Sequence, residues 1–304
     1  LHMANIRIVP ALPVLALALA GCFTTPPTRP DIPLVPVPPP PLGRPPEEIV
    51  PVPVKPAASE TPAPKAEERP KAVPTARDLV KAATARIPDL DSYIVRLTKR
   101  EIVGGRATPE EVMLFKFRAR PWSVHLKWLG KEGQGREVLL VKGRHGDNIH
   151  TLLAAGDFPL MPAGKRMSFS PDNIFVKNSC RHSITQAGLI ASVERLGKLL
   201  SDIEAGDKKA GTVAVLPPAA RPEFAKPAAA LEHTLPPGSD PTLPKGGKRT
   251  YWFCPETGLP MLCIALDERG REAEYYKHDR LHVRQKLDDD DFDPDKLFPK
   301  PSKP

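Results

Sequence analysis

The sequence of 304 residues lacks most of the features that reveal an enzyme or a ligand. It contains no Gly-rich phosphate loop, so nothing indicates a nucleotide-binding site. Beyond the N-terminal segment, no apolar stretch approaches the ~20 residues that a membrane-spanning helix requires. Only four cysteines are present, and no residues have the spacing typical of a metal site. No catalytic motif or cofactor is therefore expected.

The N-terminal segment predicts export. After Arg7 an apolar run extends to Ala20, too short to span a membrane, which is typical of a secretory signal over residues 1–21. Its end, Leu19-Ala20-Gly21-Cys22, resembles the lipobox of bacterial lipoproteins, in which the cysteine becomes the first mature residue and is acylated. At ~0.8 kcal/mol per buried methylene, acyl chains on Cys22 would anchor the protein permanently on a membrane. The alternative is a plain signal peptide with an incidental cysteine.

A disordered Pro-rich tether is expected over residues 22–76. Residues 23–76 hold 18 of the 40 prolines, and such a composition cannot bury enough surface to fold. At ~3.1 Å per residue in the polyproline II conformation, the tether would reach on the order of 150 Å from the membrane. A Pro-rich ligand for a partner domain is the alternative. Phe23 stands where Asp favours inner-membrane retention in enterobacterial lipoproteins, so we expect an outer-membrane lipoprotein that faces the periplasm.

The formal net charge of +8 would suggest a nucleic-acid partner for a cytoplasmic protein. Export changes that interpretation, and no nucleic-acid partner is expected. The basic side chains are expected to meet anionic lipid headgroups, acidic glycans or solvent. They include Lys99, Arg100, Arg118, Arg120 and Lys127.

Residues 93–143 predict an antiparallel meander of four strands separated by short turn signals. Alternate residues along these strands are apolar, and alternate side chains of a strand point to the same side. The meander is therefore expected to have one continuous apolar face. These residues are either core under a covering helix or the lining of a concavity that binds a ligand. The candidate ligand-binding residues are Phe115, Phe117, Trp122, Val124, Leu126 and Trp128 of the meander and Trp252 of a later strand.

The flanking segments complete an α+β domain over residues 77–298. A short helix is expected from Thr75, because a capping residue and an early acid precede apolar residues at helical spacing. The one long helix is predicted from Ile184 to Leu200 and would cover the apolar face of the sheet. Residues 217–247 hold 8 prolines and are interpreted as a disordered insertion, and residues 299–304 as a tail.

Further strands are expected on either side of this insertion. Residues 148–154 and 166–169 resemble a fifth and a sixth strand, and residues 211–216, 249–254, 262–266 and 271–284 continue the sheet. A four-residue turn at 255–258 would place Cys254 opposite Leu259 and Cys263 opposite Thr250. The two thiols would then be too far apart for a disulfide, so Cys180, Cys254 and Cys263 are all expected to be free.

Three polar clusters invite a chemical interpretation. His145, Asp147 and His150 lie close in sequence but around a turn, which favours solvated residues over a metal site. Ser123 and His125 share a strand face, yet a hydrolase would need a third group and an oxyanion site that the sequence does not locate. The acidic run over residues 288–295 lacks the Gly and distal Glu of a calcium loop and is expected to be a charged terminal loop.

Several short motifs together resemble a bacterial family, domain of unknown function 1571. They span roughly residues 78–298 apart from the insertion: Arg100-Glu101, Phe117-Arg118, Arg120-Pro121-Trp122-Ser123-Val124, Lys127-Trp128-Leu129, Gly135-Arg-Glu-Val138, Gly143, Arg181-His182-Ser-Ile184-Thr-Gln-Ala-Gly188 and Asp291-Phe292-Asp293-Pro294. Ser183 stands where Pro is usual in this family. The resemblance implies the lipoprotein-carrier fold of the Lol system, a strongly bent antiparallel half-barrel with helices closing its mouth. It implies no catalytic residues.

These expectations converge on a non-enzymatic envelope lipoprotein whose half-barrel binds an apolar or acylated ligand. The alternative is a protein-interaction or structural module whose concavity is filled by side chains of the long helix. A hydrolase is the third possibility and would require a polar cleft with converging His, Ser or Asp residues.

Overall fold

The computed structural model describes residues 74–158 and 160–298. The expected signal peptide, Cys22, the tether up to residue 73 and the tail 299–304 lie outside the described residues and stay predictions. No helix within the described residues is long and apolar enough to cross a membrane.

The described chain is an α+β domain built on one large antiparallel sheet. The strands are β1 (Ser92–Val103), β2 (Arg106–Ala107), β3 (Glu111–Arg118), β4 (Ser123–Trp128), β5 (Glu137–Val141), β6 (Ile149–Leu152), β7 (Arg166–Phe169), β8 (Thr212–Ala219), β9 (Ala228–Leu235), β10 (Gly247–Phe253), β11 (Pro260–Asp267) and β12 (Glu272–Val283). The helices are α1 (Ala76–Thr84), α2 (Ile174–Lys177), α3 (Leu189–Glu204) and α4 (Pro294–Leu297). Short 3₁₀ turns are η1 (Ile87–Leu90), η2 (His145–Asp147), η3 (Ile184–Gln186), η4 (Lys208–Ala210) and η5 (Asp290–Phe292).

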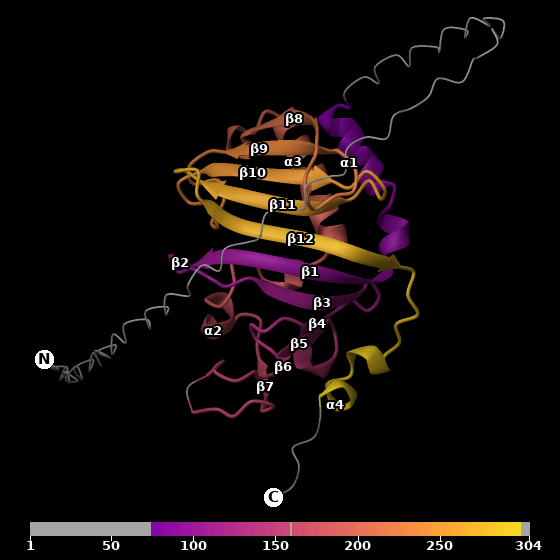
Figure 1. Cartoon of the computed structure of the whole chain (residues 1–304), viewed down its shortest axis with the longest axis vertical. Helices are drawn as coiled ribbons and strands as arrows, with labels where there is room; N and C mark the ends of the chain where they lie inside the picture. Colours follow the sequence, from indigo (N-terminus) through magenta and orange to yellow (C-terminus); the bar gives the residue numbers. More distant parts are fainter. Residues whose placement is uncertain (1–73, 159, 299–304) are drawn as a thin grey trace, which may run out of the picture. The chain divides into compact units, whose positions relative to one another are not determined.

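The sheet joins the first and last strands of the domain at its centre. Its order is β7-β6-β5-β4-β3-β1-β12-β11-β10-β9-β8, with β2 paired to β1 (Figure 1). The chain builds one wing outward from β1 to β7, crosses the sheet through α3, and returns from β8 to β12 at the centre. The expected bent antiparallel sheet covered by one long and one short helix is confirmed.

The residues at the N-termini of the two covering helices, α1 and α3, determine where each helix begins. Thr75 and Asp78 form a reciprocal capping box at the start of α1, as the sequence predicted. The long helix begins at Leu189, after η3, because its N-cap Gly188 has a φ of 104° that favours glycine. The hydroxyl of Tyr93 accepts the Leu189 N–H at 2.8 Å and satisfies one of the exposed donors of this helix end.

The main core lies between the inner face of the sheet and the two helices. Val193 and Leu196 of α3 are each 1% exposed and pack with Phe115, Phe117 and other apolar residues of the sheet. Burial of each such side chain contributes roughly 1.5–3 kcal/mol, which fixes α3 on this face. α1 packs beside α3 through Val80 and Ala83.

The interpretation of residues 217–247 as a disordered insertion is wrong. β8 continues to Ala219, and β9 pairs with both β8 and β10 as an internal strand. The prolines lie in edge strand β8 and in the connections, where they interrupt no interior hydrogen bonds. The Ala-rich start of β9 gave little hydrophobic signal, although Ala228 and Ala230 are fully buried.

The outer face of the β3–β6 wing is also covered, by a segment that we call the C-terminal strap (residues 285–298). Phe292 and Phe298 are 1% and 2% exposed and pack on Leu139, Val141 and Leu152. Asp291 pairs with Lys116 at 2.8 Å, and Asp289 pairs with both Arg118 and Arg144. The acidic run is therefore a charged terminal segment, as expected, whose carboxylates neutralise basic residues of the outer face.

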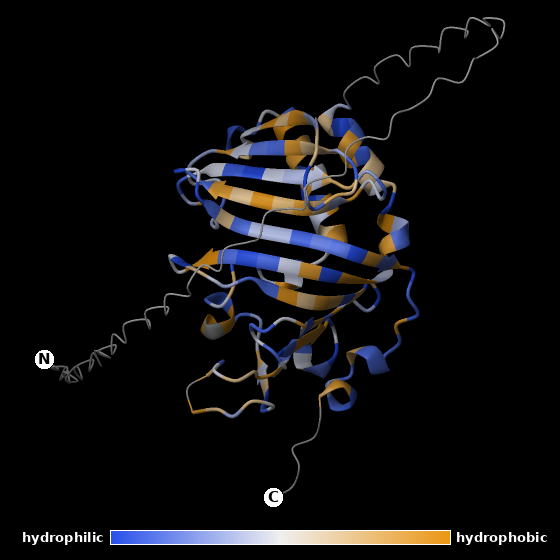
Figure 2. Cartoon of the chain, viewed as in Figure 1, coloured by the Kyte–Doolittle hydropathy of each residue, from blue (hydrophilic) through white to orange (hydrophobic). Residues whose placement is uncertain are grey.

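Hydrophilic residues gather at the centre of the sheet, where the most apolar strands are usually found. Figure 2 shows β1 and β12 largely in the hydrophilic colours, in contrast to β11 beside them. On the inner side, these two strands carry charged groups that line a cavity.

Candidate functional site

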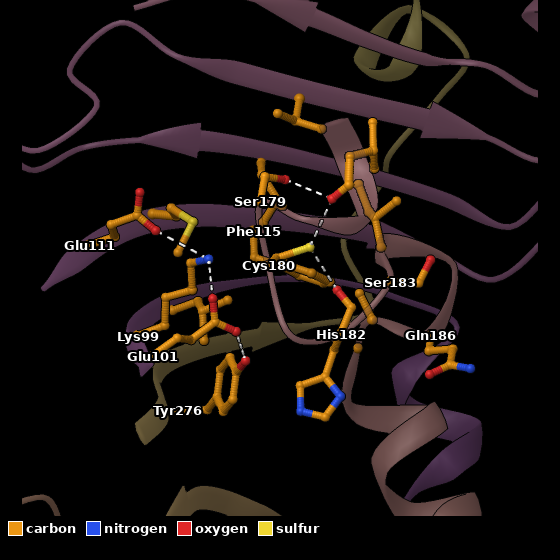
Figure 3. Close-up of a pocket in the computed structure, with 18 of the residues that line it drawn as sticks. Lys99, Glu101, Glu111, Phe115, Ser179, Cys180, His182, Ser183, Gln186 and Tyr276 are labelled. Atoms are coloured by element: carbon orange, nitrogen blue, oxygen red, sulfur yellow. Dashed lines mark hydrogen bonds and ion pairs between the residues drawn. The ribbon is translucent and has the colours of Figure 1, made fainter. Parts of the chain in front are cut away.

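A cavity of about 700 Å³ lies on the inner side of the sheet. Its walls come from the sheet, from the segment between β7 and α3, and from the first two turns of α3 (Figure 3). This volume is within the range of ~300–1,000 Å³ typical of pockets that bury a small molecule. The helix therefore fills only part of the concavity.

One part of the cavity is apolar, because alternate side chains of neighbouring strands point the same way. Phe115 of β3 is paired with Leu126 of β4, which is paired with Val138 of β5. The apolar lining consists of Leu97, Met113, Phe115, Leu126, Val138, Ile149, Leu153, Phe158, Phe169, Val176 and Ile184.

The other part is charged, and the strand register brings its members together. Glu111 of β3, Lys99 of β1 and Tyr276 of β12 are consecutive cross-strand partners. In the next row, Glu101 of β1 lies directly opposite Glu274 of β12. Arg249 enters this row from β10, because its partner on β11 is Ala265, which is also paired with Glu274.

Lys99 links two of these carboxylates. Its Nζ lies 3.1 Å from Glu101 and 3.2 Å from Glu111, and the lysine side chain is 15% exposed. Burial lowers the pKa of Lys99, but the charges of Glu101 and Glu111 outweigh burial and raise the pKa above its ordinary value. The hydroxyl of Tyr276 donates a hydrogen bond to Glu101. Lys99 is therefore a fixed cation whose charge is already balanced.

Arg136 extends this charged cluster, because it shares Glu111 with Lys99. It forms a bidentate ion pair with Asp157, donates to Glu111 at 3.0 Å, and places its guanidinium 4.9 Å from the ring centroid of Trp128. The indole N–H of Trp128 donates to Glu111 at 2.9 Å. Charge-assisted bonds and ring stacking together lock the orientation of this tryptophan.

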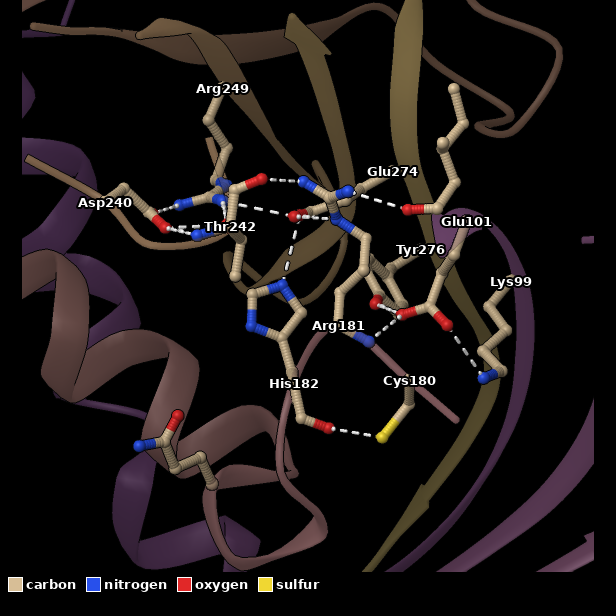
Figure 4. Close-up of polar contacts among 12 residues, drawn as sticks. Lys99, Glu101, Cys180, Arg181, His182, Asp240, Thr242, Arg249, Glu274 and Tyr276 are labelled. Atoms are coloured by element: carbon tan, nitrogen blue, oxygen red, sulfur yellow. Dashed lines mark hydrogen bonds and ion pairs between the residues drawn. The ribbon is translucent and has the colours of Figure 1, made fainter. Parts of the chain in front are cut away.

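Glu274 is the centre of a buried polar network (Figure 4). Its side chain is 1% exposed and lies 2.9 Å from Arg181, 3.2 Å from His182 and 3.3 Å from Arg249. Burial alone would raise the pKa of Glu274, but the hydrogen bond from His182 and the charge of Arg249 hold the pKa well below its ordinary range. Arg181 also donates to the carbonyl oxygens of Ile102 and Thr242, so this network attaches the segment before α3 to the sheet.

Arg195 differs from the other cations of the cavity. It lies on α3, is exposed at the mouth, and donates to the Gln186 carbonyl at 3.0 Å and the Ser192 hydroxyl at 3.2 Å. Among the described residues, no carboxylate forms an ion pair with it.

Two thiols face the cavity. Cys180 donates to the His182 carbonyl at 3.1 Å, and burial raises the pKa of its thiol. Burial also raises the pKa of Cys263 to about 12. Cys180, Cys254 and Cys263 are free, as predicted. Cys263 faces Tyr251 instead of Thr250, because the β10–β11 register shifts between Trp252 and Phe253.

The sequence-predicted site residues fall into three environments. Phe115, Leu126 and Trp128 line the cavity. Phe117, Val124 and Trp122 belong to the core, where the rings of Phe117 and Trp122 meet edge to face with centroids 6.1 Å apart.

Trp252 lies on the opposite face of the sheet. It packs with Ala230, Leu262 and Tyr275, and the guanidinium of Arg221 lies 4.6 Å from its ring centroid. Its neighbour Tyr251 takes the inward position instead. The hypothesis that all three tryptophans line one concavity does not fit this arrangement.

The charged half of the site was missed by sequence reasoning. Lys99, Glu111 and Glu274 sit at inward positions of strands, where a charge is normally taken to mark the solvent face, and Arg136 directly precedes β5. The alternation of residues along β1 could have revealed that these charges point inward. Lys99 and Glu101 share a parity with the apolar residues Tyr93, Val95 and Leu97 of the same strand.

The polar residues that the sequence singled out contact other protein groups in the structure. Ser123 donates to the Pro121 carbonyl at 2.7 Å, and His125 contacts Glu137 at 2.8 Å, both on the face that the C-terminal strap covers. The rings of His145 and His150 meet edge to face. No group of three or more His, Cys, Asp or Glu residues among the described positions could hold a metal ion.

The fold and the site together define a half-barrel protein with a cavity between its sheet and the start of a covering helix. The chain belongs to the family described as protein of unknown function (DUF1571), whose sequence model matches residues 90–297. No curated protein matches the chain.

Solved structures with similar folds include three proteins of known origin. MucB of Pseudomonas aeruginosa is 15% identical with a TM-score of 0.41, over 72% of this chain and 62% of MucB. The lipoprotein LppX of Mycobacterium tuberculosis is 12% identical with a TM-score of 0.36, over 68% and 98% of the two chains. A LolA superfamily protein of Nitrosomonas europaea is 14% identical with a TM-score of 0.32, over 74% and 100%. The chain thus spans less than two thirds of MucB.

Proposed function

We propose that this protein is a non-enzymatic envelope lipoprotein that binds an apolar or acylated ligand in its half-barrel cavity. Acylation of Cys22 would hold it on a membrane, with the outer membrane favoured, and the Pro-rich tether would extend the domain into the periplasm. The role that follows is the handling of lipids or lipoproteins.

One observation carries this proposal: the apolar part of a cavity of about 700 Å³ is not filled by the covering helix. An empty apolar space of this size forfeits dispersion contacts, which a ligand restores. The charged groups around it are paired with one another, through Lys99, Arg136 and Arg249. A charged part beside an apolar part of one cavity suits a molecule with a long apolar part and one polar end.

The alternative is an interaction module, in which side chains of α3 fill the concavity. Leu189, Val193 and Leu196 do fill the part next to α1. The remaining space favours ligand binding over this alternative. A hydrolase would need a nucleophile whose proton a base at the cavity accepts. Cys180 and His182 both line the cavity, but the thiol donates to the His182 backbone carbonyl while the His182 ring contacts Glu274. Ser123 and His125 lie on the other face.

Native mass spectrometry of the full chain, purified from its own membrane, tests the proposal. We expect a co-purifying lipid that is lost in Val138→Trp, since the larger ring occupies the apolar half of the cavity. Leu129→Trp is the matched control, because Leu129 is 51% exposed and lies outside the cavity. Absence of any lipid from the wild-type protein, or its equal retention by Val138→Trp, would contradict ligand binding in the cavity.

A further inference from the structure

Among the described residues, each Lys or Arg that lines the cavity forms an ion pair with a carboxylate except one. Lys99, Arg136 and Arg249 each contact two carboxylates. Within the part of the chain that the structure describes, Arg195 donates hydrogen bonds to the Gln186 carbonyl and the Ser192 hydroxyl and to no carboxylate. A guanidinium has five N–H donors, so Arg195 keeps donors free for a further acceptor.

The side chain of Arg195 borders the cavity as well as bulk solvent. Arg195 is a lining residue, and its positive charge opposes the effect of burial on the pKa of Cys263, after a larger contribution from Arg249. Gln186 also lines this side, and its side-chain amide has no hydrogen bond to any described residue. Figure 3 shows Gln186 and Ser183 across the cavity from Lys99 and Glu111.

Size limits the apolar part of the ligand. A cavity of about 700 Å³ holds one molecule of roughly drug size. One long acyl chain with a small head group has this size, whereas a lipoprotein anchor with three acyl chains is several times larger.

We propose that the ligand is a single-chain amphiphile with an anionic head group, whose chain occupies the apolar lining around Phe115 and whose head group binds Arg195 and Gln186. This inference rests on the proposed function and names the class of ligand. A carboxylate and a phosphate both present the acceptor oxygens that a guanidinium binds bidentately.

The test compares probes that share one chain length and differ in head group. Palmitate, hexadecyl phosphate, hexadecanol and hexadecyltrimethylammonium are titrated below their micelle concentrations into the full chain. Every sample carries Cys22→Ser, so that no acyl anchor of the protein itself competes with the probes. We expect the two anions to bind about tenfold more tightly than hexadecanol, and the cation to bind most weakly. The tighter of the two anions identifies a carboxylate or a phosphate as the preferred head group.

Variants assign the preference to Arg195. Arg195→Gln should weaken binding of the anions by about three- to tenfold and leave hexadecanol unchanged, since an exposed cation contributes modestly. Arg195→Lys should restore part of the preference. Lys198→Gln is the matched control, because Lys198 lies on the same helix and pairs with Asp202 outside the cavity. Its anion affinity should equal that of the parent protein.

The outcomes separate this inference from the proposed function. If every single-chain probe binds equally, or if Arg195→Gln keeps the anion preference, the head-group assignment is wrong while cavity binding stands. Tighter binding of a triacylated lipopeptide than of palmitate would overturn the single-chain class. If no probe binds, the proposed function itself fails.

Discussion

Glu101 and Glu274 lie directly opposite each other at the centre of the sheet, 3% and 1% exposed. Like charges at such positions destabilise a sheet unless cations compensate them. Lys99 pairs with Glu101, whereas Arg181 and Arg249 pair with Glu274. Arg181 comes from the segment before α3, so this compensation also fixes one wall of the cavity.

Removal of Arg181 should therefore destabilise the domain. Arg181→Met leaves Glu274 buried with one fewer cation, and we expect the free energy of unfolding to fall by about 2–4 kcal/mol. Urea denaturation measures this change. Arg106→Met is the control, because Arg106 is exposed and forms no ion pair with a described residue. Equal stability of the two variants would show that the opposed carboxylates need no compensation from Arg181.

His278 should make stability depend on pH. Burial lowers its pKa to about 4 from an ordinary value of 6.5. Between these values the unfolded chain binds a proton that the folded chain does not, so stability falls as pH falls. From pH 7 to pH 5, the free energy of unfolding should decrease by about 1–2 kcal/mol more in the wild type than in His278→Gln.

His282→Gln is the control for this prediction, because His282 lies on the same strand but is exposed. Denaturant titrations at the two pH values give the comparison. The prediction fails if His278→Gln and the wild type lose the same stability over this interval.

The C-terminal strap should contribute much of the stability of the β3–β6 wing. Phe292→Ala removes a ring that is 1% exposed, and we expect a loss of about 3–5 kcal/mol. Leu129→Ala truncates an exposed side chain and should change stability by less than about 0.5 kcal/mol. Thermal unfolding of both variants measures the difference. A loss below about 1 kcal/mol for Phe292→Ala would mean that the strap packs loosely.

The sequence predicted the sheet well where alternation was regular. In β4, Leu126 and Trp128 take the expected inward positions. It predicted the outer face poorly, because the cover over Ser123 and His125 is an acidic segment with only two buried phenylalanines. An acidic run in isolation resembles a solvated tail, and only the basic residues of distant strands give it a place to pack.

The cavity itself could not be predicted in full. The alternation of residues in β3 correctly predicted that Phe115 points inward. It could not show that Phe115 lines the cavity, whereas Phe117, two residues away, is covered by α3. That distinction depends on where α3 begins, and Gly188 delays its start by five residues from the predicted Ile184. Trp252 was placed on the inner face because the register of β10 was not determined by its sequence.

Lipidation at Cys22 is tested by Cys22→Ser. The variant should either leave membranes or accumulate as an uncleaved precursor, since serine cannot carry the acyl chains of a lipoprotein cysteine. Membrane fractionation and the intact mass distinguish these results. A processed protein of wild-type size that still sediments with membranes would show that another feature anchors the chain.

Contact between an acyl chain and Trp128 tests the central claim most directly. Trp128 lines the cavity, whereas Trp122 is packed in the core and Trp252 faces outward. A bromine-labelled fatty acid quenches tryptophan fluorescence on contact. We predict saturable quenching in the wild type that is largely lost in Trp128→Phe, with the same binding measured by calorimetry. Quenching that is absent from the wild type, or unchanged in Trp128→Phe, would contradict binding in this cavity.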